Sequence, residues 1–517
     1  MSVRSRLVAA TGGMALVTVA SRVTGYLRDK TVAVLLGAGN VADAFYAGLA
    51  IPNMFRAFLA EGALHAAFIP ALAELKETGG EERQRAFVRA MTATLLLALP
   101  LIVLLGVLLA PFLVEVFAHG LKRDPATVEL AVRFTRQMFP YLGLISLAAL
   151  AQGVLNASGR FLLPAATPIA LNLCAVAGAL VAVLLGGAWS WLAIGVLAGG
   201  GAQLAMQLRA CSRAGLPLLP GGGGLRNPAV RRVLALMLPG IPALGVYQLT
   251  LLLSYRFASQ VGAGAVTARF NAARLSELVY GVLFVQLTTA VLPLLSAERA
   301  RDPEEARRTL GFALRLMSLV ALPAAVFLLV LAGPIVGTAF GGGAYTREHV
   351  AMTAGALAMY AWGLPFLGLT KLLAATSYAW KDTRQPVLAA AANLAVFFAL
   401  GQTWTTAYGV AGVAAAASAG QMVNASVLLL LAGLARRLPR AREVLPGLAR
   451  HALAAAGLGA ALAISATHLP AMAATSARSL ALLGALAAGA AGLYLGLLLL
   501  LRAPEWQEAR QLLRRKR

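Results

Sequence analysis

Charged residues are scarce in this sequence of 517 residues, and acidic ones are scarcer than basic ones. Only 12% of the residues are charged, 20 acidic and 44 basic, whereas 60% are apolar and the mean hydropathy is +0.78. A soluble protein of this length needs more polar surface than this composition supplies. The shortage of charge therefore excludes a soluble globular fold and indicates that lipid surrounds most of the chain.

Cysteine and histidine are also rare. Cys174 lies in an apolar stretch and Cys211 near a basic helix end, which supports neither a disulfide framework nor a thiolate metal site. The five histidines are scattered along the chain. The sequence has no adjacent Asp pair, Asp-x-Asp, His-Glu-x-x-His or nucleophile elbow, which argues against a membrane enzyme acting on a polyprenyl diphosphate. We therefore expect a protein that is not an enzyme and requires neither metal nor cofactor.

Apolar stretches recur along the whole chain, and no polar segment between them is long enough to fold separately. A membrane-spanning helix needs about 20 mainly apolar residues, and Gly, Pro and charged residues divide the sequence into fourteen such stretches. They lie near residues 8–36, 41–73, 86–114, 127–155, 161–185, 188–208, 230–258, 265–296, 308–338, 349–377, 386–404, 407–434, 447–468 and 478–501. The sequence thus predicts an all-α membrane protein with 14 transmembrane helices.

The basic residues alternate along these spans. If the N-terminus is cytoplasmic, 30 basic residues fall in inward loops and ends, and only Lys122, Arg123, Arg347 and Arg478 fall in outward loops. This is the asymmetry that the positive-inside rule describes, so we expect both termini to be cytoplasmic. The net charge of +24 is then a signal of topology. It does not predict nucleic acid as a partner, and the Arg-rich C-terminal tail is expected to contact anionic membrane lipids.

The sequence contains an internal repeat. Residues 37–45 (GAGNVADAF) are similar to residues 262–270 (GAGAVTARF), and residues 159–164 (GRFLLP) to residues 381–386 (KDTRQP), each followed by an apolar stretch with an Asn, Asn172 or Asn393. Because the offset spans six helices, both copies have the same orientation in the membrane. We expect a lobe of helices 1–6 at residues 1–220 and a lobe of helices 7–12 at 221–440, related by a pseudo-two-fold axis normal to the membrane, with helices 13–14 and the basic tail at 441–517. Such transporters bind their substrate between the lobes.

Several charged residues fall inside the predicted spans, where an arginine facing lipid costs about 2.5–3.5 kcal/mol. Lys30, Arg133, Arg136 and Arg269 are close enough to helix ends to extend to the membrane surface. Two deeper sets remain. The basic set is Arg22, Arg28, Arg56 and Arg274, with Lys371 as a further candidate, and the acidic set is Asp29, Asp43, Glu61 and Glu277.

Two interpretations fit these deep charges. They could form purely structural ion pairs, such as Arg274 with Glu277 at i and i+3. Alternatively they line a water-filled cavity of net positive charge between the lobes, where arginine favours phosphate or diphosphate. Gly25 and Pro52 lie beside these charges and are candidate hinges, because helix breaks are tolerated where they line a cavity.

The same residues carry a resemblance to a known family. The stretches SRVTGYLRD at 21–29, GAG at 37–39, DAF at 43–45, IPNMFR at 51–56 and AEGA at 60–63 strongly resemble the N-terminal signature of the MviN family. These are the lipid II flippases, also called MurJ, of the multidrug/oligosaccharidyl-lipid/polysaccharide exporter superfamily. Further matches lie at 152–156, 164–172, 273–277 and 371–386, and the likeness is weak after about residue 440.

The resemblance implies a fourteen-helix flippase of the bacterial inner membrane. Its substrate would be lipid II, undecaprenyl-diphosphate-linked disaccharide-pentapeptide, moved from the cytoplasmic to the periplasmic leaflet by alternating access. Helices 13 and 14 would line a groove for the polyprenyl tail. Coupling to the membrane potential, H⁺ or Na⁺ is open, and partners include membrane lipids and, as a candidate, the cell-wall synthesis machinery. By motif, Arg22, Arg28, Asn53, Arg56, Arg274 and Lys371 would bind substrate, and Asp29, Asp43, Glu61 and Glu277 would form gating ion pairs.

Two departures from the family pattern and three rival functions stay open. Ala57 stands where a second basic residue is common, and residues 277–281 (ELVYG) lack the usual Pro, which puts the bend of helix 8 in question. The rivals of the same fold are an O-antigen or capsule lipid-oligosaccharide flippase and a cation-coupled drug antiporter, although an antiporter should carry acids in its cavity. A scaffold without transport activity is the third.

Overall fold

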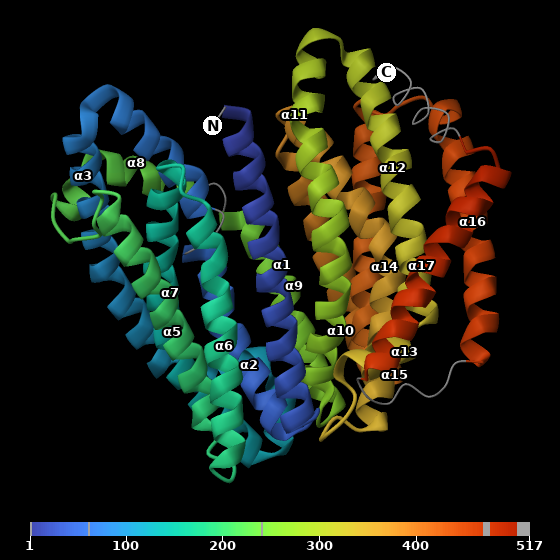
Figure 1. Cartoon of the computed structure of the whole chain (residues 1–517), viewed down its shortest axis with the longest axis horizontal. Helices are drawn as coiled ribbons and strands as arrows, with labels where there is room; N and C mark the ends of the chain where they lie inside the picture. The colour runs from blue at the N-terminus through green and yellow to red at the C-terminus, as the bar shows by residue number, and fades with distance from the viewer. Residues whose placement is uncertain (1–2, 60–62, 239–240, 469–475, 504–517) are drawn as a thin grey trace. The chain divides into compact units, whose positions relative to one another are not determined.

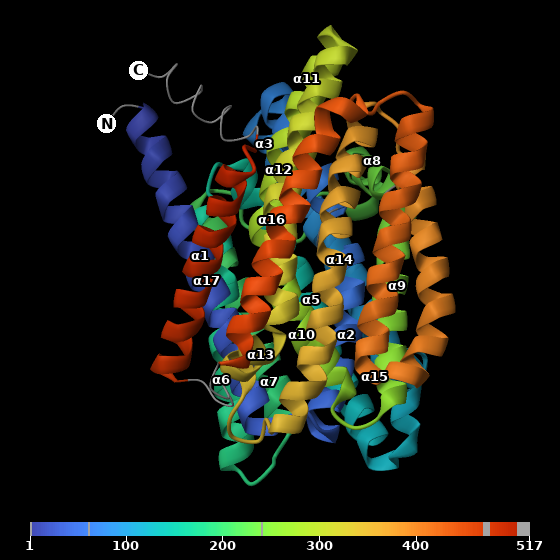
Figure 2. The ribbon, with the colours of Figure 1, turned by 90° about the vertical axis from the view of Figure 1, so that its right-hand side faces the viewer.

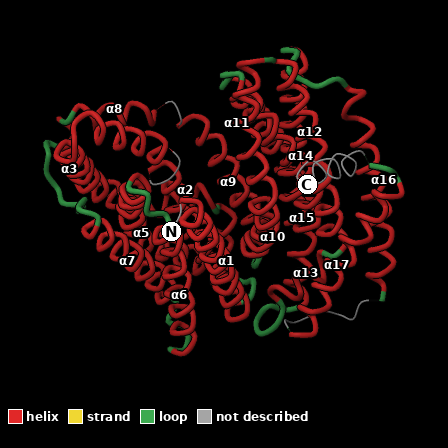
Figure 3. Tube along the Cα trace, turned by 45° about the horizontal axis from the view of Figure 1, so that its top comes forward, coloured by secondary structure: helices red, strands yellow, loops and turns green. Residues whose placement is uncertain are grey.

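The computed structural model describes residues 3–59, 63–238, 241–468 and 476–503. Within these ranges the chain is helical and contains no β-strand, as Figure 3 shows, and the only β-type contact is an isolated bridge between Gly342 and Tyr345. This agrees with the predicted all-α membrane fold. Helices are favoured because they satisfy every backbone hydrogen bond internally, which a chain in lipid requires.

The chain divides into two compact units, residues 1–248 and 249–517. In the first unit, coloured blue to green in Figure 1, a bundle of long helices is completed by short ones. Its elements are α1 (Val3–Leu36), α2 (Asn40–Leu59), α3 (Ala63–Leu108), α4 (Ala110–Phe117), the 3₁₀ turn η1 (His119–Arg123), α5 (Pro125–Ala157), α6 (Leu162–Leu184), α7 (Ser190–Arg213), η2 (Gly224–Arg226) and α8 (Pro228–Met237). The helix α9 (Ile241–Val261) begins in this unit and ends in the next.

The second unit continues from α9 to the C-terminus. Its further elements are α10 (Ala265–Val279), the π-helical turn η4 (Tyr280–Phe284), α11 (Val285–Arg301), α12 (Pro303–Val330), α13 (Ala332–Phe340), α14 (Arg347–Ala379), α15 (Arg384–Leu434), α16 (Ala441–Thr467) and α17 (Ala477–Leu500). The three-part division predicted from the sequence, at residues 220 and 440, stays a prediction.

Each unit has its own apolar core. In the first, α1 packs on α6, α2 on α5, and α5 on α3 and α7, and the rings of Phe68 and Phe87 stack with centroids 5.3 Å apart. In the second, α14 packs on α10, α12 and α15. The helices α16 and α17 lie side by side in Figures 1 and 2 and share a core with α12 and α13 around Leu458 and Tyr494.

Ten helices of the described residues are long and apolar enough to cross a membrane. Two of them contain a glycine with non-helical backbone: Gly80 in α3 (φ 70°, ψ −177°) and Gly409 in α15 (φ 59°, ψ −136°). These angles are accessible mainly to glycine, so each helix is bent sharply at that residue. The count of fourteen spans and the cytoplasmic position of the termini stay predictions.

The joints between helices repeat along the chain. Four left-handed joint residues of the first half each have a left-handed counterpart 221 to 225 residues later. The pairs are Gly37 and Gly262, Gly159 and Lys381, Gly187 and Gly409, and Gly215 and Arg436. The first two pairs lie in the sequence repeat itself, and the other two extend it. The backbone therefore repeats its turns at the spacing that the sequence repeat predicts.

Candidate functional site

The basic residue with the best defined surroundings in α1 is Arg28. Its Nε and Nη2 donate to Asp29 Oδ1 at 3.0 and 2.7 Å, and its Nη1 donates to Asn172 Oδ1 at 3.1 Å. Asp29 is buried and the Arg28 side chain is 19% exposed. The contact with Asn172 is possible because α1 packs along α6, which carries that residue. The guanidinium is thus held in one orientation at the side of the first unit's bundle.

Asn172 also contacts the turn of α1 below Arg28. Its Nδ2 donates to the Ser21 carbonyl at 3.3 Å and to Thr24 Oγ1 at 3.2 Å. The predicted hinge Gly25 lies in the same turn, and a Cβ there would lie 3.5 Å from Asn172 Nδ2. Arg22, one turn away, is exposed. The two arginines of α1 thus differ in their surroundings: Arg28 is held by Asp29 and Asn172, whereas Arg22 is exposed.

The helix α2 carries the second group of predicted site residues. Asp43 is fully buried near its start, and Pro52 is buried inside the helix. Asn53 and Arg56 follow within the next turn, both partly buried. Glu61 lies outside the described residues. Because Pro52 has no N–H to donate to the carbonyl four residues earlier, α2 is weakened just before Asn53 and Arg56.

The remaining predicted site residues lie in the second unit. Arg274 Nη1 donates to Glu277 Oε2 at 3.2 Å, which is the ion pair that their i, i+3 spacing predicts, and both side chains are about half exposed. Lys371 in α14 is exposed, and its Nζ lies 5.6 Å from the ring centroid of Tyr280. Tyr280 begins the π-helical turn η4. Where the family's usual Pro is missing, the helix thus contains a π-turn.

The prediction for Arg269 was wrong. Instead of extending toward the membrane surface, this arginine is only 8% exposed; its Nε donates to Ser254 Oγ at 2.7 Å, and its guanidinium lies 4.7 Å from the Tyr255 ring centroid. The physical reason is that α9 and α10 fold back on each other, which places an aromatic face and a hydroxyl beside the arginine. The sequence did not predict the contact between Asn172 and Arg28. The one signal that pointed to Asn172 was its pairing with Asn393 in the internal repeat.

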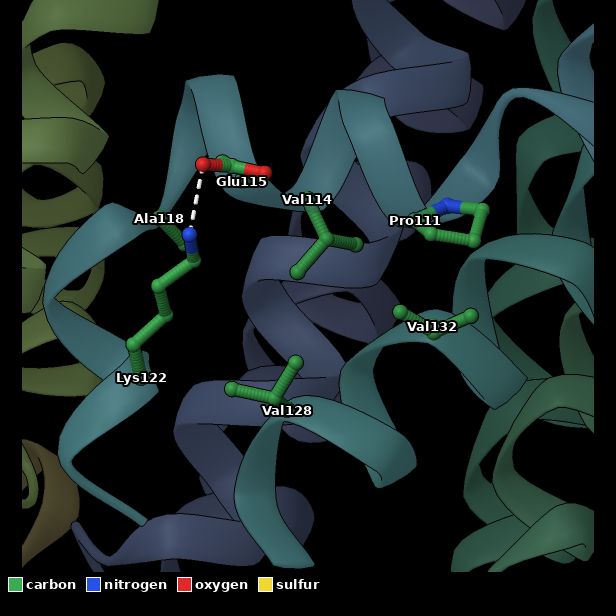
Figure 4. Close-up of a pocket in the computed structure, with 7 residues that line it drawn as sticks. All are labelled: Pro111, Val114, Glu115, Ala118, Lys122, Val128 and Val132. Carbon is green, nitrogen blue, oxygen red and sulfur yellow. Dashed lines mark hydrogen bonds and ion pairs between the residues drawn. The ribbon is translucent and has the colours of Figure 1, made fainter. Parts of the chain in front are cut away.

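A small hollow lies elsewhere in the first unit. It has a volume of about 190 Å³, and its lining is mainly apolar, drawn from α4, η1 and α5. Figure 4 shows the ion pair between Lys122 and Glu115 at one side and valines facing one another across the space. None of the predicted substrate-binding residues lines it, so this hollow does not belong to the charged groups described above.

Comparison with known proteins identifies close relatives. The family model described as "Lipid II flippase MurJ" matches residues 32–479. The "Lipid II flippase MurJ" of Burkholderia cenocepacia is 39% identical over 425 residues, which cover 81% of this chain and 82% of that protein. The "Probable lipid II flippase MurJ" of Rhizobium meliloti is 35% identical, over 87% of this chain and 85% of that protein.

The fold is also found among solved structures. The structure titled "Lipid II flippase MurJ, inward closed conformation" has a TM-score of 0.78 and 22% identity, and the match covers 96% of this chain and 99% of that one. An inward-facing multidrug resistance transporter of the MATE family in the MOP superfamily has a TM-score of 0.65 and 16% identity, over 82% of this chain and 98% of that one. These neighbours are transporters, in agreement with the prediction that the protein is not an enzyme.

Proposed function

We propose, from the premise that this chain belongs to the MurJ family of lipid II flippases, that it moves lipid II from the cytoplasmic to the periplasmic leaflet of the bacterial inner membrane by alternating access. Its arginines bind the diphosphate and head group of the lipid. The polyprenyl tail stays in lipid and runs along a groove at α16 and α17. The family relationship and the multi-pass apolar helices support this assignment.

The observation that carries the proposal is the arrangement around Arg28. Of its five N–H donors, three are engaged by Asp29 and Asn172. One N–H on each terminal nitrogen has no acceptor among the described residues. A guanidinium that protein groups hold through three of its N–H donors, and that keeps two donors, is suited to bind diphosphate oxygens, because charge-assisted hydrogen bonds to phosphate are strong and directional.

Arginine removal tests the proposal. In a strain whose own flippase can be depleted, Arg22, Arg28, Arg56 and Arg274 are replaced singly by Ala, and membrane abundance, growth and lipid II exposed at the outer leaflet are measured. Loss of a hydrogen bond to a charged group costs about 1.5–3 kcal/mol, so we expect transport to fall about tenfold or more at unchanged abundance. The matched control is Arg133→Ala, because Arg133 forms an exposed pair with Glu129.

Normal lipid II exposure in all four variants would contradict the proposed arginine roles. If the wild-type chain fails to restore lipid II exposure but exports another lipid-linked oligosaccharide, its substrate is instead an O-antigen or capsule lipid-oligosaccharide. In the first outcome the gating roles of Asp29, Asp43, Glu61 and Glu277 would also lose their support.

The energy source is part of the same proposal. Because Arg28 and Arg56 lie within the spans predicted from the sequence, the membrane potential is one candidate energy source; moving one charge across a potential of 100 mV corresponds to about 2.3 kcal/mol. H⁺ or Na⁺ coupling would instead act through the deep carboxylates. Collapsing the potential, the proton gradient and the sodium gradient separately, while following lipid II exposure, identifies which gradient is required.

A further inference from the structure

The amide of Asn172 contacts two parts of α1, the side chain of Arg28 and the turn at Ser21 and Thr24. Its oxygen accepts from the Arg28 guanidinium, and its nitrogen donates to the Ser21 carbonyl and to Thr24 Oγ1. Asn172 is 5% exposed, so its polar groups depend on these partners rather than on water. One side chain of α6 is therefore hydrogen-bonded both to the Arg28 guanidinium and to the turn of α1 next to Gly25.

The contact at Ser21 bears on the helix itself. In a regular α-helix this carbonyl accepts from the N–H of residue 25. Here Thr24 Oγ1 also donates to it, at 3.0 Å, together with Asn172. Side chains that insert donors into the helical hydrogen-bond ladder are among the known causes of helix bending. A Cβ at Gly25 would lie in ordinary van der Waals contact with the amide, 3.5 Å from Asn172 Nδ2, so this turn of α1 passes close to Asn172.

The second copy of the repeat provides an internal comparison. Asn393 in α15 occupies the corresponding position and is similarly buried, at 6% exposure, but its Oδ1 has no hydrogen-bond partner among the described residues. At the offset of 225 residues, Arg28 corresponds to Leu253 and Asp29 to Ser254. A buried Asn at this point of the repeat thus has a charged partner only in the first copy, where the predicted phosphate-binding arginine lies.

We propose that Asn172 is a positioning residue of the transport site, which holds Arg28 toward the diphosphate and links that contact to the turn of α1 at Gly25. The inference rests on the proposed function, because it assigns Arg28 to the diphosphate of the substrate. When Arg28 engages an anion, the pull on its Nη1 changes the amide contact, and the amide transmits this change to the Ser21 carbonyl. Asn172 itself does not touch the substrate.

The test measures ligand selectivity in the purified, detergent-solubilised full-length protein. The dissociation constants of undecaprenyl diphosphate and of uncharged undecaprenol are compared for the wild type, Asn172→Ala, Asn172→Asp, Arg28→Ala and the matched control Asn393→Ala, with thermal midpoints recorded for each. Asn172→Asp keeps the side-chain volume and the acceptor for Arg28, but it removes the donor to Ser21 and adds a negative charge beside the guanidinium.

We expect both Asn172 variants to weaken diphosphate binding about tenfold, which corresponds to about 1.4 kcal/mol, and to leave undecaprenol binding unchanged. Asn393→Ala should bind both ligands like the wild type. Unchanged diphosphate affinity in both Asn172 variants, with Arg28→Ala weakened, would overturn the inference alone. Equal weakening of both ligands in both variants would make Asn172 a packing residue and overturn it as well. Unchanged affinity in Arg28→Ala would overturn the proposed role of Arg28 together with the inference.

Discussion

Asp382 and Arg437 form an ion pair that joins the two ends of α15. Arg437 Nη2 donates to Asp382 Oδ2 at 3.0 Å, and the backbone N–H groups of Arg384 and Gln385 donate to Asp382 Oδ1. Burial by itself raises the pKa of the Asp382 carboxyl, but the hydrogen bonds from Arg437 and the two N–H groups outweigh it and lower the pKa below its usual value. The charged carboxylate is therefore the form that stabilises this end of the unit.

The lowered pKa predicts how stability changes with pH. The contribution of Asp382 is present above its unfolded pKa of about 3.9 and is lost as the pH falls through the lower folded pKa. At pH 7 we expect Asp382→Asn to lower the free energy of unfolding by about 1 kcal/mol, a figure that allows for the partial exposure of the pair. The thermal midpoint should fall accordingly. Below about pH 4 the difference from wild type should shrink. Melting curves from pH 7 to pH 3 check this, with the exposed Glu82→Gln as control; a difference independent of pH would contradict it.

At the scale of single elements, the π-turn η4 interrupts the helix that runs from α10 into α11. A π-turn arises from one extra residue in an α-helix and is frequent at functional sites. Tyr280, its first residue, faces the ammonium group of Lys371, and Arg274 and Glu277 precede it by one to two turns. The turn is thus a candidate for the flexible point that the family's Pro would otherwise supply.

Deletion of Val282 should remove this flexible point. Because the turn contains one extra residue, the deletion restores a continuous α-helix and keeps the faces of α10 and α11; Val282 is 50% exposed, so little core packing is lost. We expect normal membrane abundance with lipid II exposure reduced severalfold. The control is deletion of the exposed Leu294, which rotates the rest of α11 by about 100° and should lower abundance. Full transport without Val282 would show that the turn is not required.

The bend at Gly409 gives a second prediction at this scale. Its backbone lies in a region that only glycine adopts readily, and a Cβ would lie 3.4 Å from Val261 Cγ1. Gly409→Ala should therefore cost about 1–3 kcal/mol and reduce the amount of folded protein in the membrane. Gly333→Ala in α13, where the added Cβ would meet open space, is the matched control and should be neutral. Equal abundance of the two variants, measured by fluorescence-detected size exclusion, would contradict the prediction.

For the whole molecule, the charge asymmetry predicts which ends of the first unit's helices face the cytoplasm. In a background of Cys174→Ala and Cys211→Ala, we expect Ala126→Cys to react with a membrane-impermeant maleimide in intact cells with a permeable outer envelope. Glu82→Cys, near the bend of α3, should react only after the inner membrane is opened. Both positions are exposed, so access rather than burial decides the outcome. The reverse pattern would invert the predicted topology.

Hydropathy, together with the Gly, Pro and charged residues that separate apolar stretches, was sufficient to predict most helices closely. The stretches 161–185 and 478–501, for example, correspond to Leu162–Leu184 and Ala477–Leu500. The paired joints of the repeat were also within reach, because turn residues and their spacing are local properties. The contact between Arg28 and Asn172 was not, since the two residues are 144 apart in sequence and meet only through helix packing. The burial of Arg269 was missed for the same reason, because periodicity does not reveal what a neighbouring helix offers.

The paired joints differ in one respect that affects how the chain is made. Gly159 and Gly215 in the first copy are replaced by Lys381 and Arg436 in the second, although all four have positive φ. A side chain in this conformation costs about 1–2 kcal/mol that glycine avoids. During membrane insertion, however, loops with basic residues tend to stay on the cytoplasmic side and so set the orientation of the helices. In the predicted topology both of these joints lie on the cytoplasmic side. We therefore expect a glycine at either position to relieve the backbone strain of the folded protein and to weaken the charge signal that orients the helices during insertion.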